Sequence, residues 1–208
     1  MGNSVKFWDK ISARYAKQPI TDEAAYQKKL AVTREYLTSG MSVLEIGCGT
    51  GLTAINHSLY VGNILAIDAS SKMIAIAQAK AAKEKVGNVI FEQSTIEDLK
   101  IGTNSLDVVL ALSVLHLVDE RDEVIANVYK MLKPGGVFVS STMCLGDSMM
   151  KLLKFIVPVG MFFGFMPSVK VFTANEFEAS LTKAGFEIEH RWLPGKGAAL
   201  FLVARKMG

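Results

Sequence analysis

The stretch Val43–Ala54, VLEIGCGTGLTA, joins a short apolar run to three glycines that alternate with other residues. The apolar run predicts a strand, and the glycines predict a tight loop between that strand and its helix. Glycine permits positive φ angles and lets a ligand come close to the backbone. In open α/β sheets, ligands bind beyond the carboxyl ends of the strands. This stretch therefore predicts both the fold class and the position of a binding site.

The apolar runs on either side of this loop predict a parallel sheet. Strands are expected at 41–46, 63–68, 88–93, 105–112 and 136–142, which are rich in Val, Ile and Leu. Near-continuous apolar runs are typical of strands that are covered on both faces. Strands that alternate with helices along a chain form right-handed βαβ units and a doubly wound sheet.

The helical segments carry their own start and stop signals. Helices are expected at 4–18, 21–38, 70–86 and 119–136. The last of these has acidic residues in its first turn and lysines in its last, the order that the helix dipole favours, and Pro134 stops it. Ser94–Glu97 and Thr173–Glu176 have the S/T-x-x-E spacing of a capping box.

The end of the chain departs from the alternation of strand and helix. FEIEHRW (186–192) and AALFLVARK (198–206) are separated only by LPGKG. Two strands this close in sequence pair as a hairpin, so one of them runs antiparallel to the rest. The predicted fold is therefore α/β, a doubly wound seven-stranded sheet that is mostly parallel, with an antiparallel C-terminal hairpin.

Composition and charge exclude several classes of protein. The chain has 208 residues, 50% of them hydrophobic, and its formal net charge of +3 does not indicate a nucleic-acid partner. Cys48 and Cys144 form no CxxC pair and no ligand-spaced cluster, which fits a reducing cytoplasm and gives no metal site. The most apolar segment, 155–167, is too short and too interrupted by proline and glycine to cross a membrane.

Other glycine-loop families fit the opening stretch less well. The dinucleotide fingerprint needs Gly or Ala where this chain has Leu52, and no Gly-Lys-Ser/Thr of a phosphate loop follows. The spacing E-x-G-x-G-x-G instead resembles the class I S-adenosylmethionine (SAM) dependent methyltransferases, particularly small-molecule enzymes of the ubiquinone/menaquinone type. The resemblance runs through residues 41–142 and the final hairpin, and it includes Asp68 and the LKPGG segment before the fifth strand.

The resemblance implies a Rossmann-like fold with SAM as the cofactor. Asp68 follows Gly47 at about the spacing at which an acidic residue meets a ribose diol, so it is expected to accept from both hydroxyls. Glu45 is expected near the cationic end of SAM, through loop amides or water. The other implied cofactor-binding residues are Gly47, Cys48, Gly49 and Gly51 in the loop, Ala69, Met73, Thr95 and Ile96 around the adenine, and Leu112 beside the methionine portion.

Two residues are candidates for a part in the reaction. Methyl transfer is an in-line displacement, so the protein must mainly align the acceptor and exclude water, and it needs a base only where the acceptor loses a proton. His116, just beyond the fourth strand, is a candidate for catalysis or substrate positioning, with packing or helix capping as the alternative. Tyr15 is the second, because N-terminal segments of the family fold over the cofactor; its alternative is packing on the sheet. His57 and His190 are expected to be structural.

The segment after the fifth strand is expected to decide the acceptor. Residues 143–172 are rich in Met and Phe and contain lysines at both ends. Three interpretations stay open: a lid over a hydrophobic acceptor, a helical cap packed on the sheet, and a peripheral membrane contact through 149–167. No Asn/Asp-Pro-Pro-Tyr/Phe motif follows the fourth strand, which argues against methylation of nucleic-acid bases.

These patterns predict a single cytoplasmic methyltransferase domain, 1–208. Its parts are an N-terminal helical cap (1–40), a SAM-binding core (41–142), an apolar lid or insert (143–172), and a C-terminal helix and hairpin (173–208). The predicted function is methyl transfer to a small, largely apolar acceptor such as a quinone precursor or a lipid. The alternatives are a small-molecule thiol methyltransferase and a SAM-binding regulatory protein without transferase activity.

Overall fold

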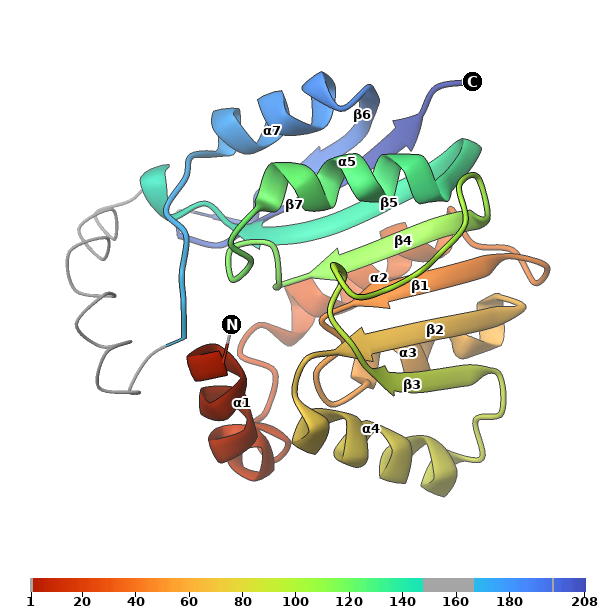
Figure 1. Cartoon of the computed structure of the whole chain (residues 1–208), viewed down its shortest axis with the longest axis vertical. Helices are drawn as coiled ribbons and strands as arrows, with labels where there is room; N and C mark the ends of the chain where they lie inside the picture. The colour runs from red at the N-terminus through yellow and green to blue at the C-terminus, as the bar shows by residue number, and fades with distance from the viewer. Residues whose placement is uncertain (1, 148–166, 196) are drawn as a thin grey trace.

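One seven-stranded sheet forms the centre of the protein (Figure 1). The computed structural model describes residues 2–147, 167–195 and 197–208. The strands are β1 (Ser42–Ile46), β2 (Asn63–Asp68), β3 (Val89–Gln93), β4 (Leu106–Leu112), β5 (Leu132–Met143), β6 (Phe186–Trp192) and β7 (Ala199–Lys206). Their order is β3-β2-β1-β4-β5-β7-β6, and every pair is parallel except those of β7 with β5 and with β6. The predicted fold class, including the antiparallel hairpin, is confirmed.

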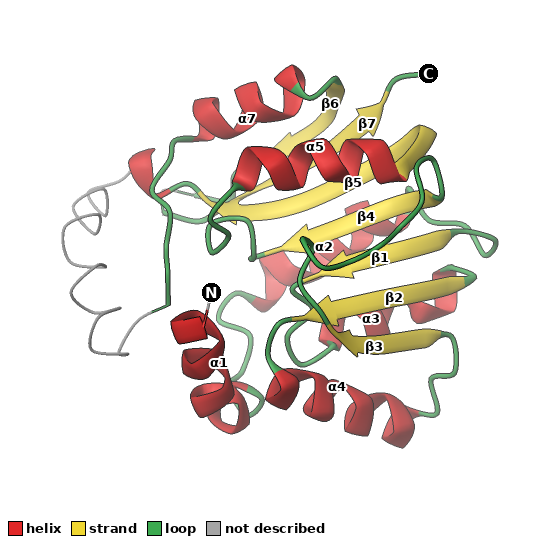
Figure 2. Ribbon diagram, viewed as in Figure 1, coloured by secondary structure: helices red, strands yellow, loops and turns green. Residues whose placement is uncertain are grey.

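Helices cover both faces of this sheet (Figure 2). They are α1 (Gly2–Tyr15), α2 (Glu23–Arg34), α3 (Leu52–His57), α4 (Ser71–Glu84), α5 (Arg121–Met131) and α7 (Ala174–Lys183), with short 3₁₀ turns η1 (Ser58–Tyr60) and η2 (Leu145–Asp147). α5 and α7 pack on one face, and α2, α3 and α4 pack on the other. α1 lies beyond the carboxyl ends of β1 and β2 and contacts α4 (Figure 1).

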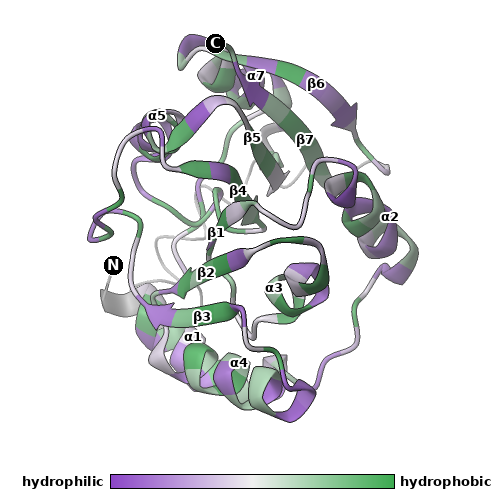
Figure 3. Ribbon diagram, turned by 90° about the vertical axis from the view of Figure 1, so that its right-hand side faces the viewer, coloured by the Kyte–Doolittle hydropathy of each residue, from purple (hydrophilic) through white to green (hydrophobic). Residues whose placement is uncertain are grey.

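Both faces of the central strands are apolar because consecutive residues point to opposite layers. In β4, Val108 and Leu110 pack towards α3 and α4, whereas Val109 and Ala111 pack towards α5 and α7. All four side chains are fully buried. Figure 3 looks along the sheet and shows α5 on one side of the strands and α2 and α3 on the other. This double coverage explains why the strands appear in the sequence as continuous apolar runs.

The helix predicted over 119–136 is shorter than expected. α5 ends at Met131, because Leu132 is already extended and begins β5. A proline disfavours the helical conformation of the residue before it, which is Lys133, so the helix ends ahead of Pro134 rather than at it. The LKPGG segment is therefore the start of a strand.

The predicted caps had different outcomes. Ser70 accepts from Met73 N at 3.1 Å and caps α4, and Thr173 forms a capping box at the start of α7. Ser94 starts no helix in the described ranges, and the prediction of a capping box there is wrong. A turn replaces it, in which Thr95 Oγ1 donates to a carboxylate oxygen of Asp98 at 2.8 Å.

Most of the predicted lid lies outside the described residues, as does the proposed membrane contact at 149–167 except for Pro167. In the part of the chain that the structure describes, no helix is long and apolar enough to cross a membrane.

The amino ends of the parallel strands hold a set of charges that are all paired. Lys206, at the end of β7, is 9% exposed. Its Nζ donates to Asn104 Oδ1 and to two main-chain carbonyls at the end of α5, each at 2.8 Å. Nearby, Lys133 Nζ pairs with Asp107 at 2.7 Å. These contacts join β7, β5 and β4 at the end of the sheet opposite the glycine loop.

Candidate active site

The glycine loop follows β1 and turns into α3. Gly47 and Gly49 have φ angles of 68° and 53°, in the left-handed region that favours glycine. A Cβ atom on Gly47 would lie 2.5 Å from Val114 Cγ2, so packing excludes a side chain there. A Cβ atom on Gly49 would meet nothing within 4 Å, so the loop presents an open backbone surface at that point. Gly51 is packed against α4 and β3 instead.

Asp68, at the end of β2, holds this loop in place. Its Oδ2 accepts from Gly49 N at 2.9 Å, and its Oδ1 accepts from Ser70 N at 2.8 Å. A carboxylate oxygen can accept two hydrogen bonds, so each can still accept one from a ligand. Burial raises the pKa of Asp68, although both N–H groups oppose that shift. The carboxylate is therefore oriented before a ligand binds.

Glu45, in β1 just before the loop, is a buried acid without a full set of partners. It is 3% exposed, and its Oε2 has no hydrogen-bond partner among the described residues. Burial, together with the charge of Asp68, raises the pKa of Glu45 to about 8. An unpaired buried carboxyl group favours a positively charged ligand nearby, because such a charge would stabilise its ionised form.

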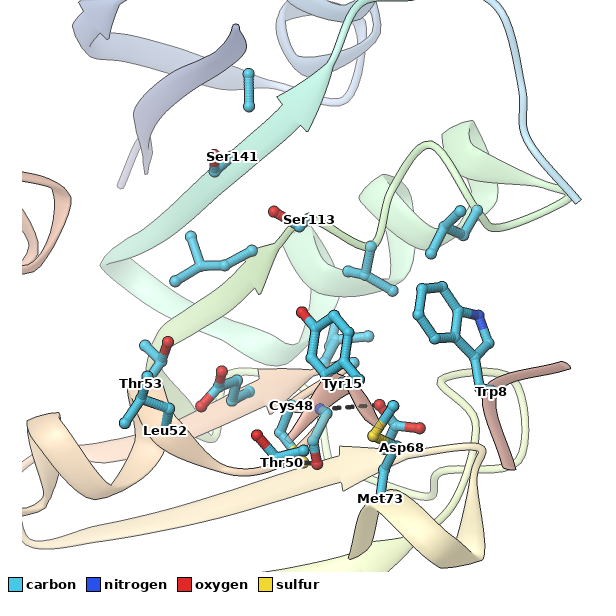
Figure 4. A pocket seen from close by; sticks show the side chains of 18 of the residues that line it. Trp8, Tyr15, Cys48, Thr50, Leu52, Thr53, Asp68, Met73, Ser113 and Ser141 are labelled. Atoms are coloured by element: carbon cyan, nitrogen blue, oxygen red, sulfur yellow. Dashed lines mark hydrogen bonds between the residues drawn. The ribbon is translucent and has the colours of Figure 1, made fainter. Parts of the chain in front are cut away.

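These groups line one cavity of about 890 Å³ at the carboxyl end of the sheet (Figure 4). Of the residues predicted from the sequence, the lining includes Tyr15, Glu45, Gly47, Cys48, Gly49, Asp68, Ala69, Met73, Thr95, Ile96 and Leu112. Gly51 and His116 are not part of the described lining. The volume is in the upper part of the range for ligand pockets, so the cavity has room for a cofactor and an acceptor together.

α1 supplies aromatic side chains to this cavity. Tyr15 and Trp8 both line it, and their rings meet edge to face with centroids 6.0 Å apart (Figure 4). Ser70 Oγ donates to Asp9 Oδ1 at 2.6 Å, which ties α1 to the start of α4. Burial and the nearby charge of Asp68 raise the pKa of Tyr15. Its hydroxyl therefore stays protonated at neutral pH and can donate a hydrogen bond.

Several polar groups of the cavity carry no sequence motif. Lys29 from α2, Ser113 after β4 and Ser141 in β5 all line it. They are far apart in the chain, so no local spacing links them. The helical periodicity of α2 was the one signal available for Lys29. Its buried residues Leu30 and Thr33 mark the side of the helix that faces the sheet and the cavity.

His116 lies between β4 and α5, in a segment whose neighbouring residues line the cavity. Its carbonyl accepts from Lys170 N at 2.8 Å, and Lys170 Nζ pairs with Asp119 at 2.9 Å. Burial lowers the pKa of His116 to about 4, and its Nδ1 has no partner among the described residues. The imidazole is therefore neutral at physiological pH, and a catalytic role for it stays a prediction.

The other histidines and cysteines show no arrangement for metal or nucleophilic chemistry. Burial lowers the pKa of His57 to about 4, and it raises the pKa of the Cys48 and Cys144 thiols. Within the described ranges, no group of three or more His, Cys, Asp or Glu side chains is placed to hold a metal ion.

The chemistry of the lining fits SAM. A sulfonium would meet the unpaired carboxyl group of Glu45, and a ribose diol would meet the oriented carboxylate of Asp68. The open surface at Gly49 allows close approach of the ligand to the backbone. Met73 and Ile96 are both buried and supply apolar surface for a base.

Comparisons with known proteins agree with this geometry. Residues 37–181 match a family described as a methyltransferase domain. Two relatives are ubiquinone biosynthesis O-methyltransferases. That of Rickettsia bellii is 36% identical over 104 residues, which are 50% of this chain and 42% of that protein. That of Rickettsia canadensis is 34% identical over 158 residues, 73% of this chain and 64% of that protein. The chain thus matches less than two thirds of the length of either relative.

A solved structure shows the same fold. A SAM-dependent methyltransferase from Aquifex aeolicus has a TM-score of 0.67 at 21% identity, over 86% of this chain and 89% of that one. The family match extends over more than half of this chain and includes the glycine loop, Asp68 and the end of β4. The chain therefore belongs to the methyltransferase domain family and is a class I SAM-dependent methyltransferase.

Proposed function

We propose that this enzyme transfers the methyl group of SAM to an oxygen atom of a small molecule with a largely apolar body. The observation that carries the proposal is the extent of the cavity. Beyond the residues that fit the cofactor, its lining continues with mainly apolar side chains from several elements: Val5, Trp8, Ile20, Leu117, Val118, Met143, Pro194 and Ala198. Apolar walls around a reacting centre favour an acceptor that is itself apolar.

The choice of oxygen rests on the relatives. Both Rickettsia proteins are named ubiquinone biosynthesis O-methyltransferases. A quinone precursor combines a hydroxyl group, which an O-methyltransferase methylates, with an apolar body, which suits the apolar walls of the cavity. A lipid with a free hydroxyl group would suit them as well.

The residues of the chain would act mainly by positioning. SAM, when bound, supplies a methyl group that its sulfonium already makes electrophilic. Asp68 and the glycine loop fix the nucleoside, and Glu45 complements the positive charge. Trp8 and Tyr15 line the cavity from α1 and would help to position the acceptor against the methyl group.

Incubation of the purified protein with methyl-labelled SAM and a cell extract tests this proposal. The labelled products are separated into lipid, volatile, aqueous small-molecule, protein and nucleic-acid fractions, with Asp68→Ala as the control. Label in the lipid or small-molecule fraction that depends on Asp68 supports the proposal. Volatile label would favour a thiol acceptor, and label confined to protein or nucleic acid would contradict the proposal.

A further inference from the structure

The net positive charge of the protein is concentrated at its N-terminal helix. Residues 2–17 contain four cations, Lys6, Lys10, Arg14 and Lys17, against one acid, Asp9. The net charge of this segment therefore equals the +3 of the whole chain, and cations and acids are equal in number over the remaining residues. All four cations are exposed. A charge distribution this uneven attracts anionic partners to α1 in preference to the rest of the molecule.

Three of these cations form a row along one side of α1. Lys6, Lys10 and Arg14 are spaced four residues apart, which places them on the same face of the helix. None of them forms an ion pair with a carboxylate of the described residues. Like charges at this spacing destabilise a helix. An anion outside the chain would remove this repulsion. These three residues are called the basic face below.

The one acid of α1 is bonded to α4 rather than to the basic face. Asp9 Oδ1 accepts from Ser70 Oγ at 2.6 Å and from Lys72 N at 3.3 Å, so its carboxylate is held at the start of α4. Trp8 and Tyr15 line the cavity. The helix is thus divided lengthwise, with its acid and its cavity-lining rings on one side and its cations on the other.

An aromatic side chain accompanies the basic face. Phe7 is three residues from Lys10 and seven from Arg14, and these spacings share a helix face. It is partly exposed and, unlike Trp8, is not part of the described lining of the cavity. Helices that lie on membrane surfaces combine exposed Lys or Arg with aromatic and apolar residues. A single row of cations on one helix does not form the groove that tracks a nucleic-acid strand.

We propose that the basic face of α1, with Phe7 beside it, docks this enzyme on an anionic lipid surface. Each cation near a negatively charged membrane adds to the attraction, and salt screens it. Because other residues of α1 line the cavity, docking would bring the cavity close to the lipid (Figure 1). The choice of lipid over other polyanions rests in part on the proposed function, since an apolar acceptor would be dissolved in the lipid.

Co-sedimentation with vesicles tests the docking without any turnover. Two kinds of vesicle are compared at low ionic strength: phosphatidylcholine alone, and phosphatidylcholine with phosphatidylglycerol as about a third of the lipid. The neutral variant replaces the basic face by glutamine: Lys6→Gln, Lys10→Gln and Arg14→Gln. The charge-retaining variant exchanges the two kinds of cation: Lys6→Arg, Lys10→Arg and Arg14→Lys. The matched control removes three exposed lysines from other helices: Lys83→Gln, Lys130→Gln and Lys183→Gln.

The parent protein should bind the anionic vesicles, stay in solution with the neutral ones, and bind less as salt is added. Each cation of the basic face should contribute about fivefold, so the neutral variant should bind roughly 100-fold more weakly. The charge-retaining variant should bind like the parent protein. The matched control has the same net charge as the neutral variant, but it should stay within about twofold of the parent protein because its lost charges lie elsewhere.

The proposal is overturned if the parent protein does not prefer anionic vesicles, if the neutral variant binds as tightly as the parent protein, or if the matched control loses as much. An RNA oligonucleotide added at the same phosphate concentration as the anionic lipid should leave most of the protein on the vesicles. Displacement by RNA would assign the basic face to nucleic acid and overturn the proposal as well.

Each variant is checked by circular dichroism and by its affinity for S-adenosylhomocysteine, which the outer side of α1 should not affect. If the neutral variant is not folded, the comparison of the parent protein with the matched control and the effect of salt still decide the outcome. Because vesicle binding needs no methylated product, absence of labelled product would contradict the proposed function and leave these results readable.

Discussion

Both ends of the central sheet carry charged side chains, but these side chains differ in how many hydrogen-bond partners they have. At the amino end, Lys206 donates to three acceptors, and Lys133 is paired with Asp107. At the carboxyl end, Lys29 donates to one hydroxyl group, and Glu45 Oε2 has no partner among the described residues. The same strands join both ends, so a parallel sheet can carry either arrangement.

Lys29 and Glu45 therefore differ from Lys206 and Lys133 in their unused hydrogen-bonding capacity rather than in carrying a charge. A buried polar group left without a partner costs about 1–3 kcal/mol, so most buried groups in folded proteins are paired. Lys29 and Glu45 both line the cavity, so a bound ligand could complete their pairing. The paired end can be tested by its stability, and the unpaired end by its affinity and by the pH dependence of stability.

The largest effect is expected from breaking the paired end. Lys206→Met removes three hydrogen bonds of a nearly buried ammonium group and should lower the free energy of unfolding by roughly 3 kcal/mol or more. Urea denaturation measures the loss, and the affinity of the folded protein for S-adenosylhomocysteine should stay unchanged. Lys133→Met is the matched control, since its ion pair is partly exposed and worth less than about 1 kcal/mol. Equal losses in the two variants would contradict the importance of complete pairing.

The unpaired Glu45 should make the ligand-free enzyme less stable as the pH rises. The pKa of Glu45 is about 8 in the folded protein and lies near 4.5 when the chain is unfolded. The folded state therefore binds more protons between these values, and stability is lost as the pH rises from 4.5 to 8. Glu45→Gln removes this loss.

Thermal melts of the parent protein and of Glu45→Gln across that range check the expectation. The variant should melt roughly 5 °C higher, or more, at pH 8, with the difference shrinking towards pH 4.5. Glu92→Gln, an exposed position on β3, should show no such trend. A difference in melting temperature that does not depend on pH would contradict the raised pKa.

A smaller effect, of tenfold or a little more in affinity, is expected at the strand end that is already oriented for a ligand. Asp68→Ala should weaken SAM binding by more than about tenfold, because it removes the acceptor expected for the ribose hydroxyls and releases Gly49 and Ser70. Comparison of S-adenosylhomocysteine with its 2′-deoxy analogue separates the two causes. The parent protein should bind the analogue more weakly than S-adenosylhomocysteine, whereas the variant should bind the two ligands equally well. If the variant binds both ligands as tightly as the parent protein does, the ribose hypothesis is refuted.

The smallest effect is expected at His116, which is close to the cavity without being part of its described lining. His116→Ala should lower methyl transfer severalfold and leave SAM affinity nearly intact, because the partly buried side chain lies between Val114 and Leu117, which line the cavity. A loss of about 100-fold or more would instead indicate proton transfer by the imidazole. If neither turnover nor affinity changes, His116 is a packing residue.

The fold was predictable because double coverage leaves a direct trace in the sequence. Each strand of the parallel core is a continuous apolar run, and the hairpin follows from the short LPGKG connection. The two errors, the end of α5 and the capping box at Ser94, came from short sequence signals that neighbouring residues override. Pro134 marks the end of α5, but its steric effect acts on the preceding residues. The spacing at Ser94 suits a capping box, yet the neighbouring Thr95 forms a turn with Asp98.

The cavity was predictable only where a residue belongs to the glycine loop or to a strand end. Asp68 and Leu112 could be placed because each closes a recognisable strand. Lys29 and Ser141 could not, because 112 positions separate them and only the packing of α2 beside β5 brings them together. Gly51 belongs to the glycine motif, so the sequence predicted it in the site. It packs against α4 and β3 instead and is not part of the described lining.

The buried carboxyl group of Glu45 gives the enzyme a charge that depends on the state of its cofactor. A sulfonium beside Glu45 favours the ionised carboxylate, whereas the neutral thioether left after methyl transfer does not. If SAM binds with its sulfonium beside Glu45, reactant should be held more firmly than product, and the kinetic trait expected from this one glutamate is weak inhibition by S-adenosylhomocysteine.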